Sequence, residues 1–411
     1  MFKNRTIGIH RLVQSPVGNF NRDDMGQPKS SVLGGVNRAV WSSQAFKRDA
    51  RNRFALGGVF SDRLRGVRTV DVAKAITAHV VENGMSDRSE EEVLASAREY
   101  LESLFKSKSM AAKEEKYKKA VQAVSEAEAK VSELDEADSK MDKAVATLNK
   151  AIAARDKASE ALSSGALVYL SKPAIAAAAA DMVNPDTPNA PSQTDLIDLL
   201  GGSISLDAAA FGRMYAADKS RSPQSLNTDA TVQVSFSVST GAFSPDVDFY
   251  TALDDATGVV ASMGHSFTGA PIMYTYMAVN VDALANTLGE DVTSDEFRDI
   301  LTLLVTSLVS AAPTGKENGS GSVPPPSTVL FTVGDTPTIL TSAFVEPCDT
   351  LSESAERLQT ALSAYSKGYG LEYSTQAVFS LDTADTVSGV RRYDVLAEAL
   401  EAAVEDATGE V

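Results

Sequence analysis

Apolar and polar residues alternate in short stretches near both ends of the chain. In the first stretch, Ile7, Ile9 and Leu12 are separated by polar neighbours. Alternation with a period of two, together with β-branched and aromatic residues, predicts β-strands. Four stretches carry this pattern or a related apolar one: Thr6–Gln14, Thr231–Ser239, Pro271–Val281 and Val329–Val333.

The long middle part of the chain, from about Val70 to Leu200, has a helical pattern instead. Its most regular portion is Ala111–Leu162, where spacings of three and four alternate as along the seam of a coiled coil. The one polar seam position, Asp138, lies in a segment (LDEADS) that suits a turn. We therefore expect a projecting antiparallel helical hairpin with solvated Lys and Glu faces. The seam comprises Tyr117, Ala120, Val124, Ala127, Val131, Leu134, Asp138, Met141, Val145, Leu148 and Ile152.

Pro, Gly, Ser and Asn mark the segments between these elements. Ser15–Gly35 is rich in them and predicts a long loop, after which Ser42-Ser43-Gln44 predicts the start of a helix. Asn184–Ser192 is a candidate domain boundary. Strands at both ends with a helical block between them predict an α+β fold, in which one discontinuous sheet domain carries a helical insertion. Two further amphipathic helices are expected, at Asp295–Ser310 and Leu396–Val411.

The charge of the chain is divided unevenly along its length. The net charge is −17, which taken alone disfavours a nucleic-acid binder. Residues 1–75, however, contain 14 Lys or Arg against five acidic residues, so they carry +9 while the remaining 336 residues carry −26. Binding of a polyanion depends on the local field and on the counterions released at the contacted phosphates. A narrow nucleic-acid track in the N-terminal fifth is therefore compatible with the composition.

Little in the sequence suggests catalysis or a cofactor. The single cysteine, Cys348, excludes an internal disulfide and a CxxC metal site, and a cytoplasmic setting is expected. The three histidines are scattered, and the chain has no P-loop, dinucleotide-binding or GxSxG motif. Asp23 and Asp24 lack further acids nearby, so loop capping is the preferred interpretation. We expect no enzyme activity, no metal and no cofactor, and no membrane contact because every apolar run is too short to span.

The most informative segment is Asn21–Arg53, in which basic residues flank a glycine pair at positions 34–35. Glycines let a backbone approach a ligand closely. On the expected helix, Lys47 and Arg51 are four residues apart and share a face, with Arg48 beside them. Arg and Lys in this arrangement suit phosphate groups. The alternative is a solvated helix whose charges pair with the acidic body.

The same segment carries a resemblance to a known family. The pattern NRDDxGxPKSxxxGGxxRxxxSSQxxKRxxR is similar to the N-terminal signature of the CasC family, the backbone subunit of the type I-E CRISPR Cascade complex. Further matches follow in order and cover most of the chain, apart from the coiled-coil segment and Gly319–Pro326. They are LDAAAFGRM (206–214), VDFYTALDD (247–255), APTGKEN (312–318) and KGYGLEYSTQAVFSLD (367–382).

The resemblance implies a fold of three parts. They are an RRM-like (ferredoxin-like) palm, a large helical fingers insertion and a β-hairpin thumb. On this chain the palm is expected at residues 1–69 and 201–411, and the fingers at residues 70–200 with the coiled-coil hairpin at 111–162. The thumb is expected within the second part of the palm, at about residues 240–275.

The resemblance also implies a function. Such subunits bind CRISPR RNA, stack head-to-tail in several copies alongside other Cascade subunits, and kink the guide at regular intervals so that it can pair with target DNA. By motif position, Met214, Tyr250 and Thr251 are expected to wedge at each kink, with core packing as the alternative for Met214 and Tyr250. The residues expected to line the guide backbone are Arg22, Lys29, Arg38, Ser42, Gln44, Lys47, Arg48 and Arg51.

Two other functions stay open from the sequence. A backbone subunit of an RNA-cleaving CRISPR system would cut target RNA with a thumb aspartate, and Asp246, Asp248, Asp254 and Asp255 lie in the right region. A coiled-coil scaffold without nucleic acid would explain the helical hairpin but would leave the basic N-terminal segment without a purpose.

Overall fold

The computed structural model describes residues 5–54, 64–69, 71–101, 108–132, 141–162, 168–187, 191–213, 227–289, 292–381 and 389–409. The chain divides into two compact units. Unit 1 comprises Met1–Leu64, Ala209–Phe211 and Asp229–Val411, and unit 2 comprises Arg65–Ala208 and Gly212–Thr228. None of the helices in the described ranges is long and apolar enough to cross a membrane.

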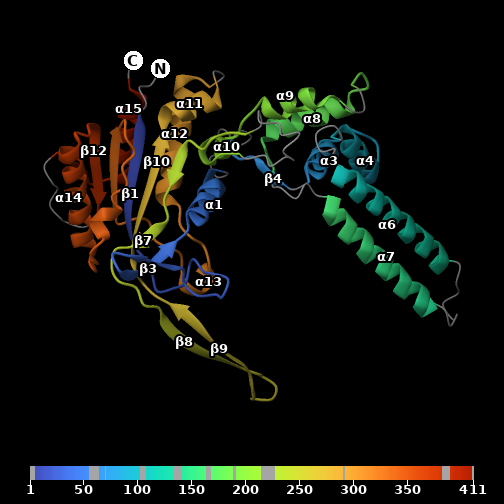
Figure 1. The fold of residues 1–411 in the computed structure, drawn as a ribbon, viewed down its shortest axis with the longest axis horizontal. Helices are drawn as coiled ribbons and strands as arrows, with labels where there is room; N and C mark the ends of the chain where they lie inside the picture. Colours follow the sequence, from blue (N-terminus) through green and yellow to red (C-terminus); the bar gives the residue numbers. More distant parts are fainter. Residues whose placement is uncertain are drawn as a thin grey trace. The chain divides into compact units, whose positions relative to one another are not determined.

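Unit 1 is built on a mixed sheet of nine strands (Figure 1). The strands are β1 (Thr6–Gln14), β2 (Ser30–Leu33), β3 (Val36–Trp41), β6 (Val232–Val234), β7 (Ser237–Ser239), β10 (Ile272–Asn280), β11 (Thr328–Gly334), β12 (Tyr373–Ser380) and β13 (Arg391–Tyr393). Their order is β13-β12-β11-β1-β10-β7-β3-β2, and β6 also pairs with β10. In the centre, Ile7 of β1 lies between Val279 of β10 and Val333 of β11. The strand nearest the N-terminus is therefore completed by residues more than 250 positions later.

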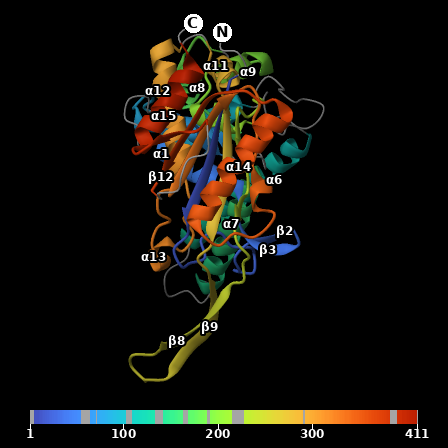
Figure 2. The same ribbon diagram turned by 90° about the vertical axis from the view of Figure 1, so that its left-hand side faces the viewer.

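Helices cover both faces of this sheet (Figure 2). On one face, α14 (Leu351–Tyr369) and the 3₁₀ helix Thr341–Phe344 pack over a core that includes Leu12, Tyr274 and Leu330. The other face is covered by α1 (Ser43–Phe54), α12 (Ser294–Ser310) and α15 (Leu396–Thr408), which contact one another through α12. Both layers follow from the alternation of apolar residues in the strands, because successive side chains point to opposite faces. Short helices α11 (Val281–Leu288) and α13 (Glu317–Ser320) complete the unit.

A separate two-stranded hairpin extends beyond the sheet of unit 1 (Figures 1 and 2). It consists of β8 (Asp246–Leu253) and β9 (Val260–Thr268), which are antiparallel. Every side chain of β8 is exposed, so neither face of the strand packs on a core. The hairpin lies within the range where the resemblance places a thumb.

Unit 2 is mainly helical. Its core, around Ile76, Ala97, Ala178 and Leu196, is enclosed by four helices and a short ribbon. These are α3 (Val72–Glu82), α4 (Glu90–Tyr100), α8 (Lys172–Val183), α9 (Gln193–Gly201), β4 (Val67–Thr69) and β5 (Val168–Leu170). The short helix α10 (Leu206–Phe211) follows where the chain passes to unit 1.

The predicted helical hairpin is confirmed as α6 (Lys108–Ser132) and α7 (Met141–Leu162), which pack on each other. Val124 and Ala127 of the predicted seam are buried, whereas Val145 is 38% exposed. The predicted seam is therefore buried at some positions and open to solvent at others. The turn expected around Asp138 lies outside the described residues.

Mixed α and β structure is confirmed, and most of the predicted elements of unit 1 are found with shifts of a few residues at most. The strand expected at Thr231–Ser239 is wrong as a single strand, because it is split into β6 and β7. Both pair with β10, but Val234 and Val238 are four residues apart while their partners, Met277 and Tyr274, are three apart. One extra residue bulges out of the strand at this point.

The long loop predicted over Ser15–Gly35 is also corrected, because its last six residues form β2 and the turn to β3. Gly34 and Gly35 have φ angles of 61° and 76°, which a two-residue hairpin turn of this type requires at both positions. A Cβ on Gly34 would also lie 2.1 Å from the carbonyl oxygen of Val345. The glycine pair therefore serves a hairpin turn packed against the sheet domain.

Candidate nucleic-acid interface

Helix α1 organises the basic segment. Phe46, Ala50 and Phe54 follow one another at intervals of four and are buried, which fixes the inner side of the helix. The opposite side carries the predicted group of Gln44, Lys47, Arg48 and Arg51, since residues three and four apart lie on the same side of a helix. Gln44 and Arg48 are exposed, and Lys47 and Arg51 are half-buried. The face that the spacing predicts is therefore present.

Lys47 lies at one border of this side. Its Nζ is 5.8 Å from the centre of the Phe211 ring, and Phe211 in turn stacks on Phe54. Burial beside these rings lowers the pKa of Lys47 from its usual value. A lysine held against an aromatic ring keeps its ammonium group in a defined place.

Two charged residues, one on β1 and one on α1, hold the end of α12. Arg11 of β1 is fully buried, and its guanidinium donates to the carbonyls of Leu308 (3.1 Å) and Ala311 (2.6 Å). Its burial lowers the pKa of Arg11 to about 9. On α1, Asp49 accepts hydrogen bonds from Arg53 Nε (2.8 Å) and from the backbone amide of Ala312 (3.0 Å). The segment that follows α12 is thus held against the helix.

A polar groove of about 740 Å³ lies beside this contact. Arg22, Arg48 and Lys316 contribute positive charge to it, and acidic side chains at positions 23, 24 and 49 contribute negative charge. Gly315 fits closely, because a Cβ there would lie 2.4 Å from the carbonyl oxygen of Phe20. Lys316 adopts φ = 55°, a left-handed conformation that is uncommon for lysine. Lys316 was not among the predicted contacts, although the motif APTGKEN contains it.

The loop before β2 is organised by its polar side chains. Asp23 Oδ1 accepts hydrogen bonds from the amides of Met25 (2.9 Å) and Gln27 (2.8 Å), which confirms loop capping for Asp23. Asn21 Oδ1 accepts from the amide of Ser42 (2.9 Å) at the start of α1. The half-buried Lys29 donates its amide to the carbonyl of Asn21 (3.1 Å). Arg22 and Lys29 are therefore placed near the N-terminal end of α1.

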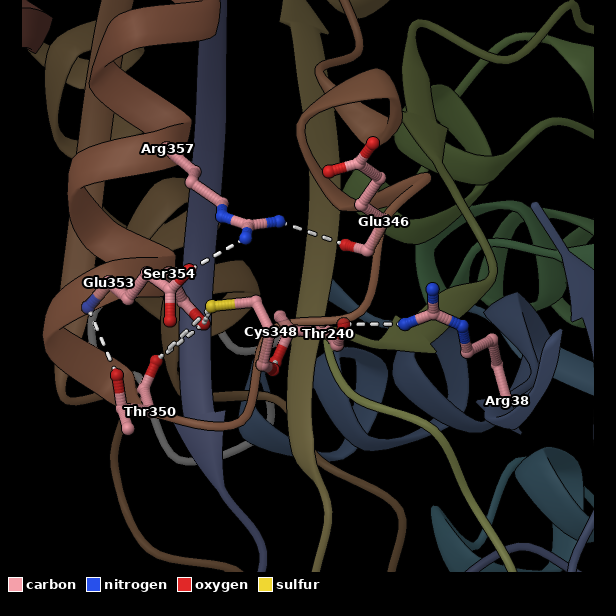
Figure 3. A network of polar contacts seen from close by, with 8 residues as sticks. All are labelled: Arg38, Thr240, Glu346, Cys348, Thr350, Glu353, Ser354 and Arg357. Atoms are coloured by element: carbon pink, nitrogen blue, oxygen red, sulfur yellow. Dashed lines mark hydrogen bonds and ion pairs between the residues drawn. The ribbon is translucent and has the colours of Figure 1, made fainter.

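The structure contradicts the prediction that Arg38 lines the guide backbone, because its side chain lies in the interior of unit 1 and not at the surface. The side chain is fully buried and donates to the carbonyls of Ser239, Thr240, Phe344 and Val345. Figure 3 shows the contact with Thr240. These carbonyls occupy both ends of the guanidinium, so it cannot reach an RNA backbone at the surface. Ser42 is also buried, with 5% of its surface exposed, so direct contact with a guide is not expected of its side chain either.

The contacts of Arg38 continue into a wider polar network (Figure 3). Thr240 Oγ1 donates to the carbonyl of Cys348 (2.9 Å), and Cys348 Sγ lies 3.3 Å from Ser354 Oγ in α14. Arg357 of α14 donates to the carbonyl of Glu346 (3.0 Å) and pairs with Glu353. The network ties β3, the end of β7 and the start of α14 together.

The base of the β8–β9 hairpin is fixed to the same region. Asn37 and Phe243 exchange two hydrogen bonds, one through the backbone carbonyl of Asn37 (2.9 Å) and one through its side-chain amide (3.0 Å). On the other side of the base, Gly269 pairs with Gly18 through backbone bonds of 3.0 and 3.2 Å. A hairpin with both ends tied in this way keeps a defined direction relative to the sheet of unit 1.

Two of the three predicted wedge residues, Tyr250 and Thr251, lie in the described hairpin. Tyr250 is 50% exposed and lies outside the core, so the core-packing alternative is wrong for it. Tyr250 and Thr251 are adjacent in β8 and therefore lie on opposite faces of the hairpin. Met214 lies outside the described residues.

Two of the four aspartates of the hairpin, Asp248 and Asp254, have structural partners. Asp248 Oδ2 accepts from Ser266 Oγ (3.1 Å) across the strands. Asp254 accepts from the amides of Ala256 and Thr257 in the turn, and these bonds lower the pKa of Asp254 from its usual value. Among the residues that the structure describes, no group of three or more His, Cys, Asp or Glu side chains could hold a metal ion.

Comparison with known proteins identifies the family. Residues 7–406 match the family described as CT1975-like protein. The chain belongs to this family. The CasC resemblance stated from the sequence motifs is thereby confirmed at the level of the family. No curated protein sequence matches the chain.

Solved structures of similar fold extend the comparison. A chain of a "CRISPR RNA-guided surveillance complex, pre-nicking" has a TM-score of 0.75 at 22% identity, over 98% of this chain and 100% of that chain. A chain of a "CRISPR RNA-guided surveillance complex" has a TM-score of 0.65 at 19% identity, over 98% of this chain and 99% of that chain. At these identities the likeness shows a shared fold.

Proposed function

We propose that this protein is the CRISPR RNA-binding backbone subunit of a type I-E Cascade surveillance complex. One observation carries the proposal: the basic side of α1 and a projecting hairpin with an exposed aromatic side chain belong to the same compact unit. A subunit that coats a guide must hold its backbone and also displace bases at intervals, and these two features suit those two tasks. In this proposal the sheet of unit 1 is the RRM-like palm, unit 2 the fingers and β8–β9 the thumb.

The guide backbone would run along the outer side of α1. Lys47, Arg48 and Arg51 contribute positive charge there, and Arg22 and Lys316 extend it into the groove. Contacts of this kind are independent of base sequence, because they involve phosphates alone. Several copies then stack head-to-tail with other Cascade subunits, and base pairing between guide and target DNA supplies the sequence specificity.

The subunit would act in the cytoplasm by binding and without cleaving RNA. Asp248 and Asp254, two of the aspartates that could serve a cleavage mechanism, are engaged with Ser266 and with the turn amides. Metal-dependent cleavage of a phosphodiester generally uses several converging carboxylates. Incubation of the assembled complex with a matching RNA and Mg²⁺ is expected to leave that RNA intact, and regularly spaced cuts would favour the RNA-cleaving alternative.

The proposal is tested by expressing the chain with its neighbouring subunits and a CRISPR array. RNA of one discrete length should copurify with the complex. Reversal of two charges in Lys47→Glu with Arg51→Glu should reduce the retained RNA, because two attractive phosphate contacts become repulsive. Lys143→Glu with Lys150→Glu is the matched control, since both lysines are exposed on α7. Equal RNA content in a folded Lys47/Arg51 double variant would rule out α1 as the backbone contact.

A further inference from the structure

Tyr250 lies across the neighbouring strand of the hairpin instead of pointing away from it. It pairs in register with Gly264 of β9, so both residues belong to the same face. A Cβ on Gly264 would lie 2.6 Å from the phenolic oxygen of Tyr250, 2.8 Å from Cζ and 3.1 Å from Cε1. The ring therefore occupies the space that a side chain at position 264 would take. Since half of Tyr250 is exposed, the side of the ring away from Gly264 meets solvent.

The rest of this face is polar or small. The neighbouring pairs in register are Asp248 with Ser266 and Ala252 with Ser262. The opposite face carries Thr251 and His265 but is mostly apolar and exposed, with Val247, Phe249 and Met263 each more than half accessible. The carboxylate of Asp248 repels phosphate, so the Tyr250 face is unsuited to an RNA backbone. An open aromatic ring beside a carboxylate instead suits a nucleobase, which stacks through its π-face and offers amino donors at its edge.

We propose that Gly264 is the positioning residue of the Tyr250 ring, the platform on which the wedge of the proposed function meets one unstacked base of the guide. This inference rests on the proposed function. A ring already packed on the Gly264 backbone loses little further freedom when a base stacks on it, which favours binding. Thr251 points to the opposite face and takes no part in this platform.

The test is Gly264→Ala in the assembled complex. Gly264 does not have a positive φ, so alanine fits the backbone, but its Cβ would displace the Tyr250 ring. We expect the periodic hyper-reactivity of the bound guide toward chemical probes to fall at least about threefold, while the RNA content per complex stays unchanged. Ser262→Ala, on the same strand and face, is the matched control and should leave the pattern as it is. Tyr250→Phe keeps the ring and should behave like the parent.

The pairing of the two residues gives a second readout. In a Tyr250→Ala background, Gly264→Ala should change the guide pattern no further, because the ring that it displaces is already gone. An unaltered pattern in folded Gly264→Ala, together with a changed pattern in Tyr250→Ala, would overturn the positioning role. An unaltered reactivity pattern in Tyr250→Ala would show that the Tyr250 ring is not the platform for a base. A parent complex that carries no RNA would contradict the proposed function instead.

Discussion

At the scale of single residues, buried ionisable side chains hold unit 1 together. Arg38 donates to four carbonyls that come from two segments, at positions 239–240 and 344–345. His10 of β1 is fully buried between aromatic neighbours, and Tyr274 Oη lies 3.0 Å from its Nδ1. The surroundings of both side chains exist only in the folded unit, so each residue leads to a measurable prediction.

Replacement of Arg38 by methionine should destabilise the protein. The four carbonyls would lose their side-chain donor inside the core, at an expected cost of roughly 2–4 kcal/mol in the free energy of unfolding. Arg48→Met, at an exposed position on α1, should change it by less than about 0.5 kcal/mol. Denaturant unfolding of the purified chain measures both. A normal unfolding midpoint in Arg38→Met combined with loss of RNA would return Arg38 to the guide-contacting set.

His10 should make stability depend on pH. Burial lowers the pKa of His10 from 6.5 to about 3, so the folded chain keeps this histidine neutral. As pH falls below about 6.5, the unfolded chain takes up the proton first, and stability is lost progressively toward pH 3. The loss at pH 5 should be about 2 kcal/mol. His10→Phe should remove this part of the pH dependence, whereas His265→Asn, at an exposed site, should keep it.

At the scale of elements, α6 and α7 stand apart from the core of unit 2. Among the residues that the structure describes, the buried cluster of that unit draws on α3, α4 with its C-cap residue Leu101, β5, α8 and α9, and on none of the α6–α7 pair. Replacing Ala111–Leu162 by a short Gly/Ser linker should therefore leave the rest of the fold and RNA binding intact. Circular dichroism would register the lost helix, and RNA content would report binding. Failure of an otherwise folded variant to assemble would identify the hairpin as an interface.

The sequence predicted elements best where a single period extended over many residues. The central strand at Thr6–Gln14 and the helix at Asp295–Ser310 were predicted to within one residue because burial imposes their pattern. The bulge after Val234 was missed because an alternating pattern does not show which residue is left unpaired. The short hairpin at Gly34-Gly35 could have been found, since a glycine pair between polar and apolar residues is a hairpin signal.

The residues of the candidate site were harder to predict from the sequence than the helices and strands. A motif shows that a residue is present but does not show which way its side chain points, and Arg38 and Arg48 differ in just this respect. Lys316 lies more than 250 positions from the groove residues Arg22 and Arg48 in the sequence. Only the fold brings them to one groove. The role of Gly264 could not be predicted from the sequence, because it depends on the ring of Tyr250 on the opposite strand.

At the scale of the whole molecule, the uneven charge predicts that salt affects folding stability and RNA retention in opposite directions. A net charge of −17 destabilises a compact chain by self-repulsion, and salt screens this repulsion. The unfolding midpoint should therefore rise with salt. RNA retention should fall, because about four phosphate contacts per copy imply a loss of roughly fifty-fold between about 50 and 200 mM salt. Lys47→Glu with Arg51→Glu should show a shallower dependence, and a salt-independent affinity would contradict phosphate binding.

The discontinuous course of the chain through unit 1 has a consequence for its synthesis. A ribosome releases β1 long before β10 and β11, whose residues flank Ile7 in the finished sheet. Nearly all of unit 2 lies between them in sequence and buries a cluster of its own, so it can fold while β1 still waits for its partners. Folding of unit 2 also shortens the loop that β1 must close, which lowers the entropic cost of pairing. Until then, the apolar residues of β1 and its unpaired edges are open to aggregation.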